Sequence, residues 1–206
     1  DLAKALCSQM GLSDICQIEA VPWNELEAKL ESGEAEAMIA GLSVNAQSRQ
    51  KFVFTRAYMR FPARFITKKA NSFSEPAAIS TRGKDIGVVA GSAHEQLLKA
   101  YFPQAVAKSF PDRAALLASL QKGEITAAFD DGMSLSFWLE SDQAHDCCVF
   151  TDGPYLAPQY LGSGLTIAVA QKNAALAIAF NSALQSLQQQ GKLTELYLRY
   201  FPTSFY

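Results

Sequence analysis

The segment of this sequence best suited to hold a ligand runs from Ala37 to Arg49 (AMIAGLSVNAQSR). Its first four residues are apolar and show no helical period, which is typical of a buried strand in a parallel sheet. Gly41 and Ser43 follow and offer backbone N–H groups and a hydroxyl at the carboxyl end of that strand, where open α/β sheets bind ligands. An ordinary turn between a strand and a helix explains the same residues equally well.

Four other side chains could transfer protons: His94, Glu95, Asp130 and Asp131. Each also has a structural interpretation. His94 and Glu95 fit the start of an exposed helix, and the two aspartates fit the cap of the helix that follows them. The structural interpretation is preferred for His94 and Glu95, whereas for the two aspartates the alternatives stay open. We expect a protein that is not an enzyme, with no catalytic residue, no metal ligand and no cofactor.

Alternating helices and strands must position these residues, and they predict an α/β fold with mostly parallel sheets flanked by helices. An aromatic-rich segment at 52–66 and a Ser/Pro/Ala-rich connection at 70–81 divide the alternation into two parts. Strands are expected at 15–20, 37–40, 86–89, 105–110, 125–129, 147–150 and 164–170, and helices at 1–10, 22–32, 92–102, 112–120, 132–139, 174–190 and 193–201.

Composition excludes several classes of partner. The 206 residues suffice for one large or two small domains, and the formal charge is −2. Basic and acidic residues are interspersed, so no basic stripe indicates nucleic acid. No segment approaches the roughly 18 uninterrupted apolar residues of a membrane helix.

The four cysteines bear on the compartment. Cys7 and Cys16 could form a disulfide if the two elements that carry them pack together, which would indicate an oxidising environment. Two small buried thiols fit the same spacing. Adjacent Cys147 and Cys148 could bridge only through a small ring, so they are predicted to be reduced strand residues, with a vicinal disulfide as the alternative. With His145 they match zinc spacing poorly.

Six motifs, in this order and over essentially the whole chain, resemble the family 3 periplasmic solute-binding proteins, the type 2 Venus-flytrap receptors for polar amino acids. They are DLAKAL, PWNEL, AGLSV, FTxxY, GVVAGSAHE and LxxxGKLxxLYxxYF. The resemblance implies two lobes, with residues 1–68 and 168–206 forming lobe 1 and residues 69–167 forming lobe 2.

The resemblance also implies a function. The chain would be a monomeric periplasmic or otherwise extracytoplasmic receptor that captures a small polar solute, an amino acid or a related compound, in the cleft between the lobes. It would present the solute to an ABC-transporter permease or to a membrane sensor. The alternatives on the same scaffold are an enzyme similar to cyclohexadienyl dehydratase, and a degenerate or sensor domain without amino-acid specificity.

Five residues match the family's ligand-binding positions. Trp23 falls on the aromatic residue that stacks on the ligand side chain, and Gly41 and Ser43 fall on positions that bind the ligand carboxylate. Ser92 falls in the lobe 2 loop at a helix N-terminus, where an anion is favoured. Asp131 falls on the carboxylate that pairs with the ligand ammonium group, although its neighbour Asp130 could be the inward one.

Two departures from the family pattern stand out. Ser48 occupies the position of the arginine that clamps the ligand carboxylate, and Arg49 follows one residue later. Arg49 is the predicted replacement, with Arg56 as a second candidate. Family members also carry a strand and a loop before the helix that matches residues 1–10. We therefore expect residues preceding Asp1, a truncated fragment or a compensating partner.

Overall fold

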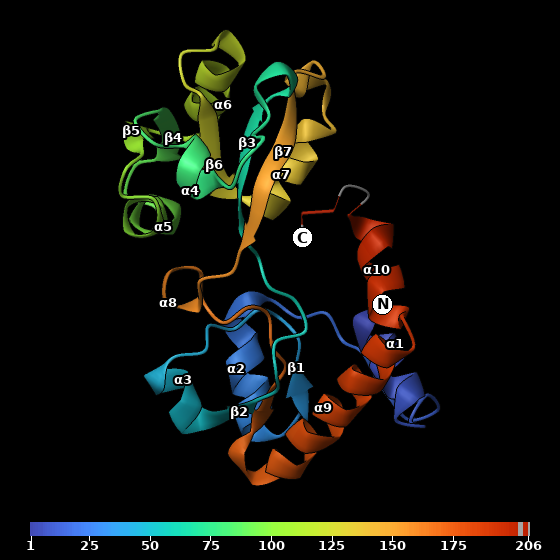
Figure 1. Ribbon diagram of the computed structural model, residues 1–206. Helices are drawn as coiled ribbons and strands as arrows, with labels where there is room; N and C mark the ends of the chain where they lie inside the picture. Colours follow the sequence, from blue (N-terminus) through green and yellow to red (C-terminus); the bar gives the residue numbers. More distant parts are fainter. Residues whose placement is uncertain (202–203, 206) are drawn as a thin grey trace. The chain divides into compact units, whose positions relative to one another are not determined.

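The computed structural model describes residues 1–201 and 204–205. The chain divides into two compact units, which are both traced in Figure 1. Unit 1 contains Asp1–Arg60 and Ser163–Tyr200. Unit 2 contains Phe61–Gly162 and the described part of Phe201–Tyr206.

Unit 1 is built on a three-stranded sheet in the order β1-β8-β2, and β8 runs antiparallel to both neighbours. One apolar cluster packs α1 and α9 together, and a second packs α2 against the sheet. The elements of unit 1 are α1 (Leu2–Gln9), α2 (Trp23–Ser32), β1 (Ala37–Met38), α3 (Ala46–Lys51), β2 (Phe52–Phe54), β8 (Ala168–Ala170), η3 (Gln171–Asn173), α9 (Ala174–Gln189) and α10 (Lys192–Tyr200).

The strand expected at residues 15–20 is wrong. The backbone N–H groups of Ile15 and Cys16 both donate to the carbonyl oxygen of Leu12, so the chain turns there instead of extending. Ile15 is 74% exposed and Ile18 is 55% exposed. Apolar β-branched residues form a strand only where a neighbouring strand accepts their hydrogen bonds, and the N–H groups of Ile15 and Cys16 have a turn partner instead.

Unit 2 is built on a five-stranded sheet in the order β5-β4-β6-β3-β7. β4 runs parallel to β5 and β6, whereas β3 runs antiparallel to β6 and β7. The elements are β3 (Ala63–Lys68), η1 (Lys69–Asn71), α4 (Ala77–Ser80), β4 (Asp85–Val89), α5 (Ala93–Tyr101), β5 (Val106–Phe110), α6 (Arg113–Lys122), β6 (Ala127–Asp131), α7 (Gly132–Leu139), η2 (Asp142–Ala144), β7 (Cys148–Tyr155) and α8 (Pro158–Leu161).

Both faces of this sheet are buried. Phe65 and Phe129 belong to the apolar cluster that includes α5, and the adjacent Ile66 and Ala128 belong to the cluster that includes α6 and α7. Successive strand residues point to opposite faces, so continuous apolar runs are what a sheet between two helical layers requires. The predicted α/β class is confirmed, with the parallel pairing confined to β4 and its two neighbours.

The chain enters unit 2 earlier than predicted. Residues 61–68 were assigned to the first lobe, but β3 lies between β6 and β7 and pairs with both. At an edge of the sheet or in a loop, this buried segment would leave backbone N–H and C=O groups without hydrogen-bond partners. On return, the chain enters unit 1 at Ser163, ahead of the predicted residue 168.

The cysteines form two disulfides, Cys7–Cys16 and Cys147–Cys148. The second corrects the prediction of two reduced strand thiols. Only Cys148 lies in β7, and Cys147 belongs to the turn before it. Two consecutive residues within a strand would point to opposite faces, whereas the turn releases Cys147 from that alternation.

Candidate functional site

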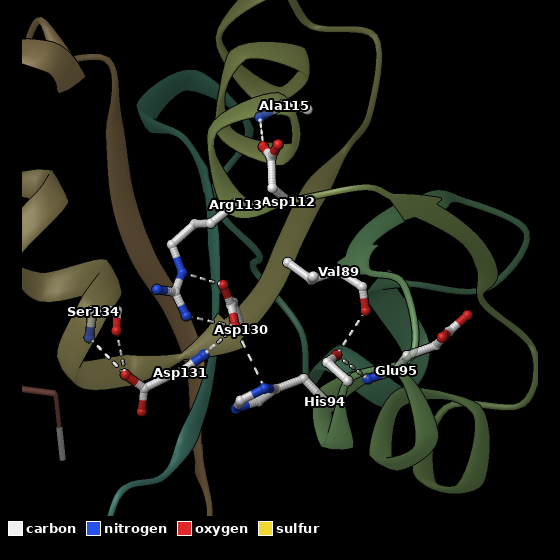
Figure 2. Close-up of polar contacts among 10 residues, drawn as sticks. Val89, His94, Glu95, Asp112, Arg113, Ala115, Asp130, Asp131 and Ser134 are labelled. Carbon is white, nitrogen blue, oxygen red and sulfur yellow. Dashed lines mark hydrogen bonds and ion pairs between the residues drawn. The ribbon is translucent and has the colours of Figure 1, made fainter.

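A polar cluster lies at the carboxyl ends of the parallel strands of unit 2 (Figure 2). Asp130 and Asp131 are the last two residues of β6. Ser92 and His94 come from the start of α5, which follows β4, and Arg113 is the first residue of α6, which follows β5. Parallel strands bring the residues after their carboxyl ends to one edge of the sheet, which explains why three separate segments meet here.

Asp130 is the buried centre of the cluster, with only 2% of its surface exposed. Arg113 donates to it twice, from Nε to Oδ2 at 2.5 Å and from Nη2 to Oδ1 at 3.3 Å. The backbone N–H of Asp131 donates to Oδ1 at 2.8 Å. A buried carboxylate is tolerated only with such partners, and its charge in turn raises the pKa of the Arg113 guanidinium.

His94 lies against the same carboxylate, with Nδ1 3.4 Å from Oδ1 of Asp130. Burial of the ring lowers the pKa of His94 below its ordinary value. Asp130 and Asp131 act in the opposite direction, and Arg113 adds to the lowering. The imidazole is therefore neutral at pH 7 and keeps one nitrogen lone pair.

Asp131 has a different role from Asp130. It is the N-cap of α7, where its Oδ2 accepts from the backbone N–H and the hydroxyl of Ser134 at 2.8 and 2.6 Å. Among the described residues, no hydrogen bond to its Oδ1 is found. Asp130 is thus the inward, paired carboxylate, and Asp131 is the half-buried one that retains an unused acceptor.

Ser92 is the N-cap of α5, with its hydroxyl oxygen accepting from the Glu95 N–H at 3.1 Å. Glu95 is fully engaged as well, because it accepts from Gly91 N–H, Lys99 Nζ and Ser109 Oγ. Hydrogen bonds from Lys99, Ser109 and Gly91, in that order, lower the pKa of Glu95 to about 2. A carboxylate that stays ionised at every physiological pH is a poor general acid.

In unit 1, Trp23 begins α2 and is 61% exposed, so its ring is available to a ligand. Gly41 has φ +73, and a Cβ there would lie 3.1 Å from Cδ2 of Leu165. Only glycine meets both conditions without strain. Ser43 is exposed, and its carbonyl oxygen accepts from the Ser48 hydroxyl at 2.8 Å.

Ser48 is fixed in place at the start of α3. Its backbone N–H donates to Oδ1 of Asn45 at 2.9 Å, and its Oγ accepts from the Asn45 N–H at 3.0 Å, which completes a capping box. Ser48 is 8% exposed, whereas Arg49 is exposed. Arg56 is exposed too, and its backbone N–H donates to Asn181.

The structure adds Arg113 to the residues singled out from the sequence, and it places His94 in the same cluster. His94 was considered only for proton transfer, and Arg113 was not considered. A signal for Arg113 was present, because it lies three residues after the end of the expected strand 105–110, at the sheet edge where Asp130 follows the expected strand 125–129. Sequence alone did not show which of the two aspartates it would meet.

Comparison with known proteins identifies the family. Residues 1–203 match the sequence profile of the bacterial extracellular solute-binding proteins, family 3. The chain belongs to this family. It is 27% identical to the arginine-binding periplasmic protein of Mannheimia haemolytica, over 96% of this chain and 78% of that protein. It is 28% identical to the ABC transporter arginine-binding protein 1 of Escherichia coli K12, over 98% of this chain and 80% of that protein.

A solved structure supports the fold. Substrate binding domain 2 of Lactococcus lactis GlnP, in its open conformation, superposes with a TM-score of 0.75 at 21% identity, over 99% of this chain and 84% of that one. Family members and named relatives are binding proteins rather than enzymes. Within the described ranges, no helix has the length and apolar character to cross a membrane, and no cluster of three or more metal-ligating side chains is found.

Proposed function

We propose that this family member is an extracytoplasmic receptor that captures a small polar solute, a cationic amino acid or a close analogue, and presents it to an ABC-transporter permease or a membrane sensor. The carrying observation is the cluster at the carboxyl edge of the unit 2 sheet, where Asp131 retains an unused carboxylate oxygen. Two relatives named as arginine-binding proteins support the choice of ligand class. Two disulfides suit the oxidising compartment that the proposal requires.

Unit 1 would contribute an aromatic surface and a carboxylate site. The exposed ring of Trp23 can stack on an apolar stem or attract a cation. Gly41 and Ser43 would donate hydrogen bonds to the ligand carboxylate. Arg49 is proposed as the charged partner of that carboxylate, since its guanidinium is exposed and has no ion pair among the described residues.

Unit 2 would contribute the group that selects the cation. Asp131 is proposed to accept from the ligand ammonium group through Oδ1, while Oδ2 stays with Ser134. Ser92, at the N-terminus of α5, is proposed to bind the ligand carboxylate. Because Arg113 neutralises Asp130, the carboxylate of Asp131 gives this cluster a net negative charge, which favours a positively charged ligand.

The proposal is tested by ligand binding to the intact protein. Thermal melting is measured with arginine, lysine, ornithine, histidine, neutral amino acids and small carboxylates, and hits are confirmed by calorimetry. A ligand that binds only the folded state raises the melting temperature. We expect the cationic amino acids to give the largest shifts.

Two variants sharpen the test. Asp131→Asn should lose cation binding, whereas Ser134→Ala, which leaves the Asp131 carboxylate in place, should retain most of it. Arg49→Ala should weaken arginine more than agmatine, which lacks the carboxylate. A melting temperature that no solute changes, or that only acidic solutes raise, would contradict the proposal.

A further inference from the structure

His94 is the one polar side chain of the unit 2 cluster that the proposed function leaves without a role. Only 17% of its side chain is exposed, and its ring packs edge-on against Phe129, with centroids 6.4 Å apart. It lies beside Asp130, as does Asp131 (Figure 2). Because one ring nitrogen lies against a carboxylate, the contact determines whether the other nitrogen carries a proton.

We propose that His94 is a specificity-determining residue whose Nε2 accepts a hydrogen bond from the ligand, and that Asp130 and Arg113 are positioning residues that hold it in this state. Together with Oδ1 of Asp131, which is proposed to accept from the ligand ammonium group, Nε2 would select a ligand whose ammonium carries at least two N–H donors, as a primary ammonium does. This inference rests on the proposed function, because it concerns the same binding site.

The tautomer follows from electrostatics. An unprotonated Nδ1 would direct a lone pair at the Asp130 carboxylate 3.4 Å away, which is repulsive, whereas an Nδ1–H is attracted to it. The proton of the neutral ring therefore resides on Nδ1, and Nε2 is left as the acceptor. A hydrogen bond from the other nitrogen commonly sets the histidine tautomer in this way.

Arg113 makes this arrangement stable at neutral pH. Without it, Asp130 would favour the doubly protonated imidazolium, which has no acceptor left. With Arg113 bound through Nε and Nη2, the carboxylate is neutralised enough to orient His94 without charging it. The N-terminus of α5, where His94 lies, also disfavours a positive imidazolium.

The ligand class follows from the two acceptors. A quaternary ammonium carries the same charge as a primary ammonium but has no N–H to donate. If Asp131 acted through charge alone, the two would bind similarly. With Nε2 and Oδ1 as hydrogen-bond acceptors for the ligand ammonium group, L-arginine should bind at least roughly tenfold more tightly than Nα-trimethyl-L-arginine, since a hydrogen bond to a charged group contributes about that much.

Binding should also depend on pH in a defined direction. The groups that face His94 are Asp130 and Asp131 from β6 and Arg113 from α6, and the balance of burial and charge lowers the pKa of His94. Affinity for L-arginine should be full above that pKa and fall as the pH drops through it, by up to tenfold per pH unit. Protonation removes the acceptor and adds a positive charge beside a cationic ligand.

The chain offers a matched control because it has only two histidines, His94 and His145. His145 lies in the exposed turn before β7. We expect His94→Ala to weaken L-arginine at pH 7.5 by roughly tenfold or more. His94→Gln, which keeps an acceptor, should bind more tightly than His94→Ala and lose the pH dependence. His145→Gln should behave like the wild type at every pH.

The positioning role has its own readout in the ligand-free protein. Nitrogen-15 NMR of the imidazole should show Nδ1 protonated and Nε2 free in the wild type, and a mixture of tautomers in Asp130→Asn. Arg113→Met should raise the pKa of His94. These measurements do not depend on finding the right solute.

The outcomes separate the two proposals. If the wild type binds L-arginine or L-lysine but His94→Ala binds them equally well, the inference is overturned and the receptor function stands. Equal binding of Nα-trimethyl-L-arginine, or a proton on Nε2 in the ligand-free protein, would overturn it as well. A wild type that binds none of the three probes would remove both proposals.

Discussion

Replacing Arg113 by methionine should destabilise unit 2 because it leaves the Asp130 carboxylate buried without its charged partner. The carboxylate is 2% exposed, and its hydrogen bonds from Arg113 are the only side-chain hydrogen bonds to it that the structure describes. Methionine keeps the apolar stem of the arginine, so the loss reports mainly on the charge.

The size of the effect follows from the burial of the two partners. Breaking a fully buried ion pair by removing one member costs about 3–5 kcal/mol. Arg113 is 42% exposed on its side chain, so water can replace part of what it supplied, and the Asp131 N–H remains in place. We therefore expect Arg113→Met to lower the free energy of unfolding by about 2–3 kcal/mol.

The double variant Arg113→Met/Asp130→Asn tests the reasoning. Asparagine keeps the shape and removes the charge, so the double variant should be less destabilised than Arg113→Met alone, by about 1 kcal/mol. Urea unfolding is followed by Trp138 fluorescence in a Trp23→Phe background, because the two tryptophans lie in different units and the units can unfold separately. Effects of the two substitutions that simply add would refute the charge argument.

Three further stability predictions can be checked by urea unfolding under non-reducing conditions. Cys7→Ser/Cys16→Ser should lower the free energy of unfolding by about 2.5 kcal/mol, because the Cys7–Cys16 disulfide closes a loop with a sequence separation of 9. The Cys147–Cys148 disulfide closes almost no loop, so Cys147→Ser/Cys148→Ser should lower it much less. Equal losses in the two variants would contradict the loop argument. Gly164→Ala should cost more than Gly162→Ala, because its Cβ would lie 2.4 Å from the Met59 carbonyl oxygen. Gly162→Ala, with open space around it, should cost only the strain of its backbone conformation (φ 79, ψ 171), about 1–3 kcal/mol. Ser48→Ala should cost about 1 kcal/mol as its capping box is lost, and the exposed neighbour Gln47→Ala should be nearly neutral.

The elements of unit 2 from β4 to α7 could be predicted closely because their signals are local. Asp112 precedes α6 as an N-cap and Gly123 ends it in a left-handed conformation, both readable in sequence. The failure at residues 15–20 has the opposite cause. Whether Ile15 and Ile18 form a strand depends on a partner elsewhere in the chain, and apolar character alone does not supply one.

The candidate site shows the same division. Ser92 and Asp131 were singled out through the family resemblance, and the structure shows each as the N-cap of a helix. The charge state of His94 could not be predicted, since it depends on Asp130 and Arg113, which are distant in sequence and meet only through the order of the strands. Electrostatic environments of this kind are tertiary properties.

Ser48, which stands where the family pattern has an arginine, differs from it in its structural role as well as in its chemistry. In α3 the side chains of residues 48 and 49 differ by about 100° in direction, and Ser48 takes the inward one. Turning Arg49 inward by rotating the helix would break the Asn45 capping box and expose the Ser48 hydroxyl that donates to Ser43. Under the proposed function, Arg49 would bind a ligand carboxylate through its own flexible stem, which orders several rotatable bonds at an entropic cost. On that proposal, recognition should depend less on Arg49 and the carboxylate than on Asp131 and the ligand ammonium group.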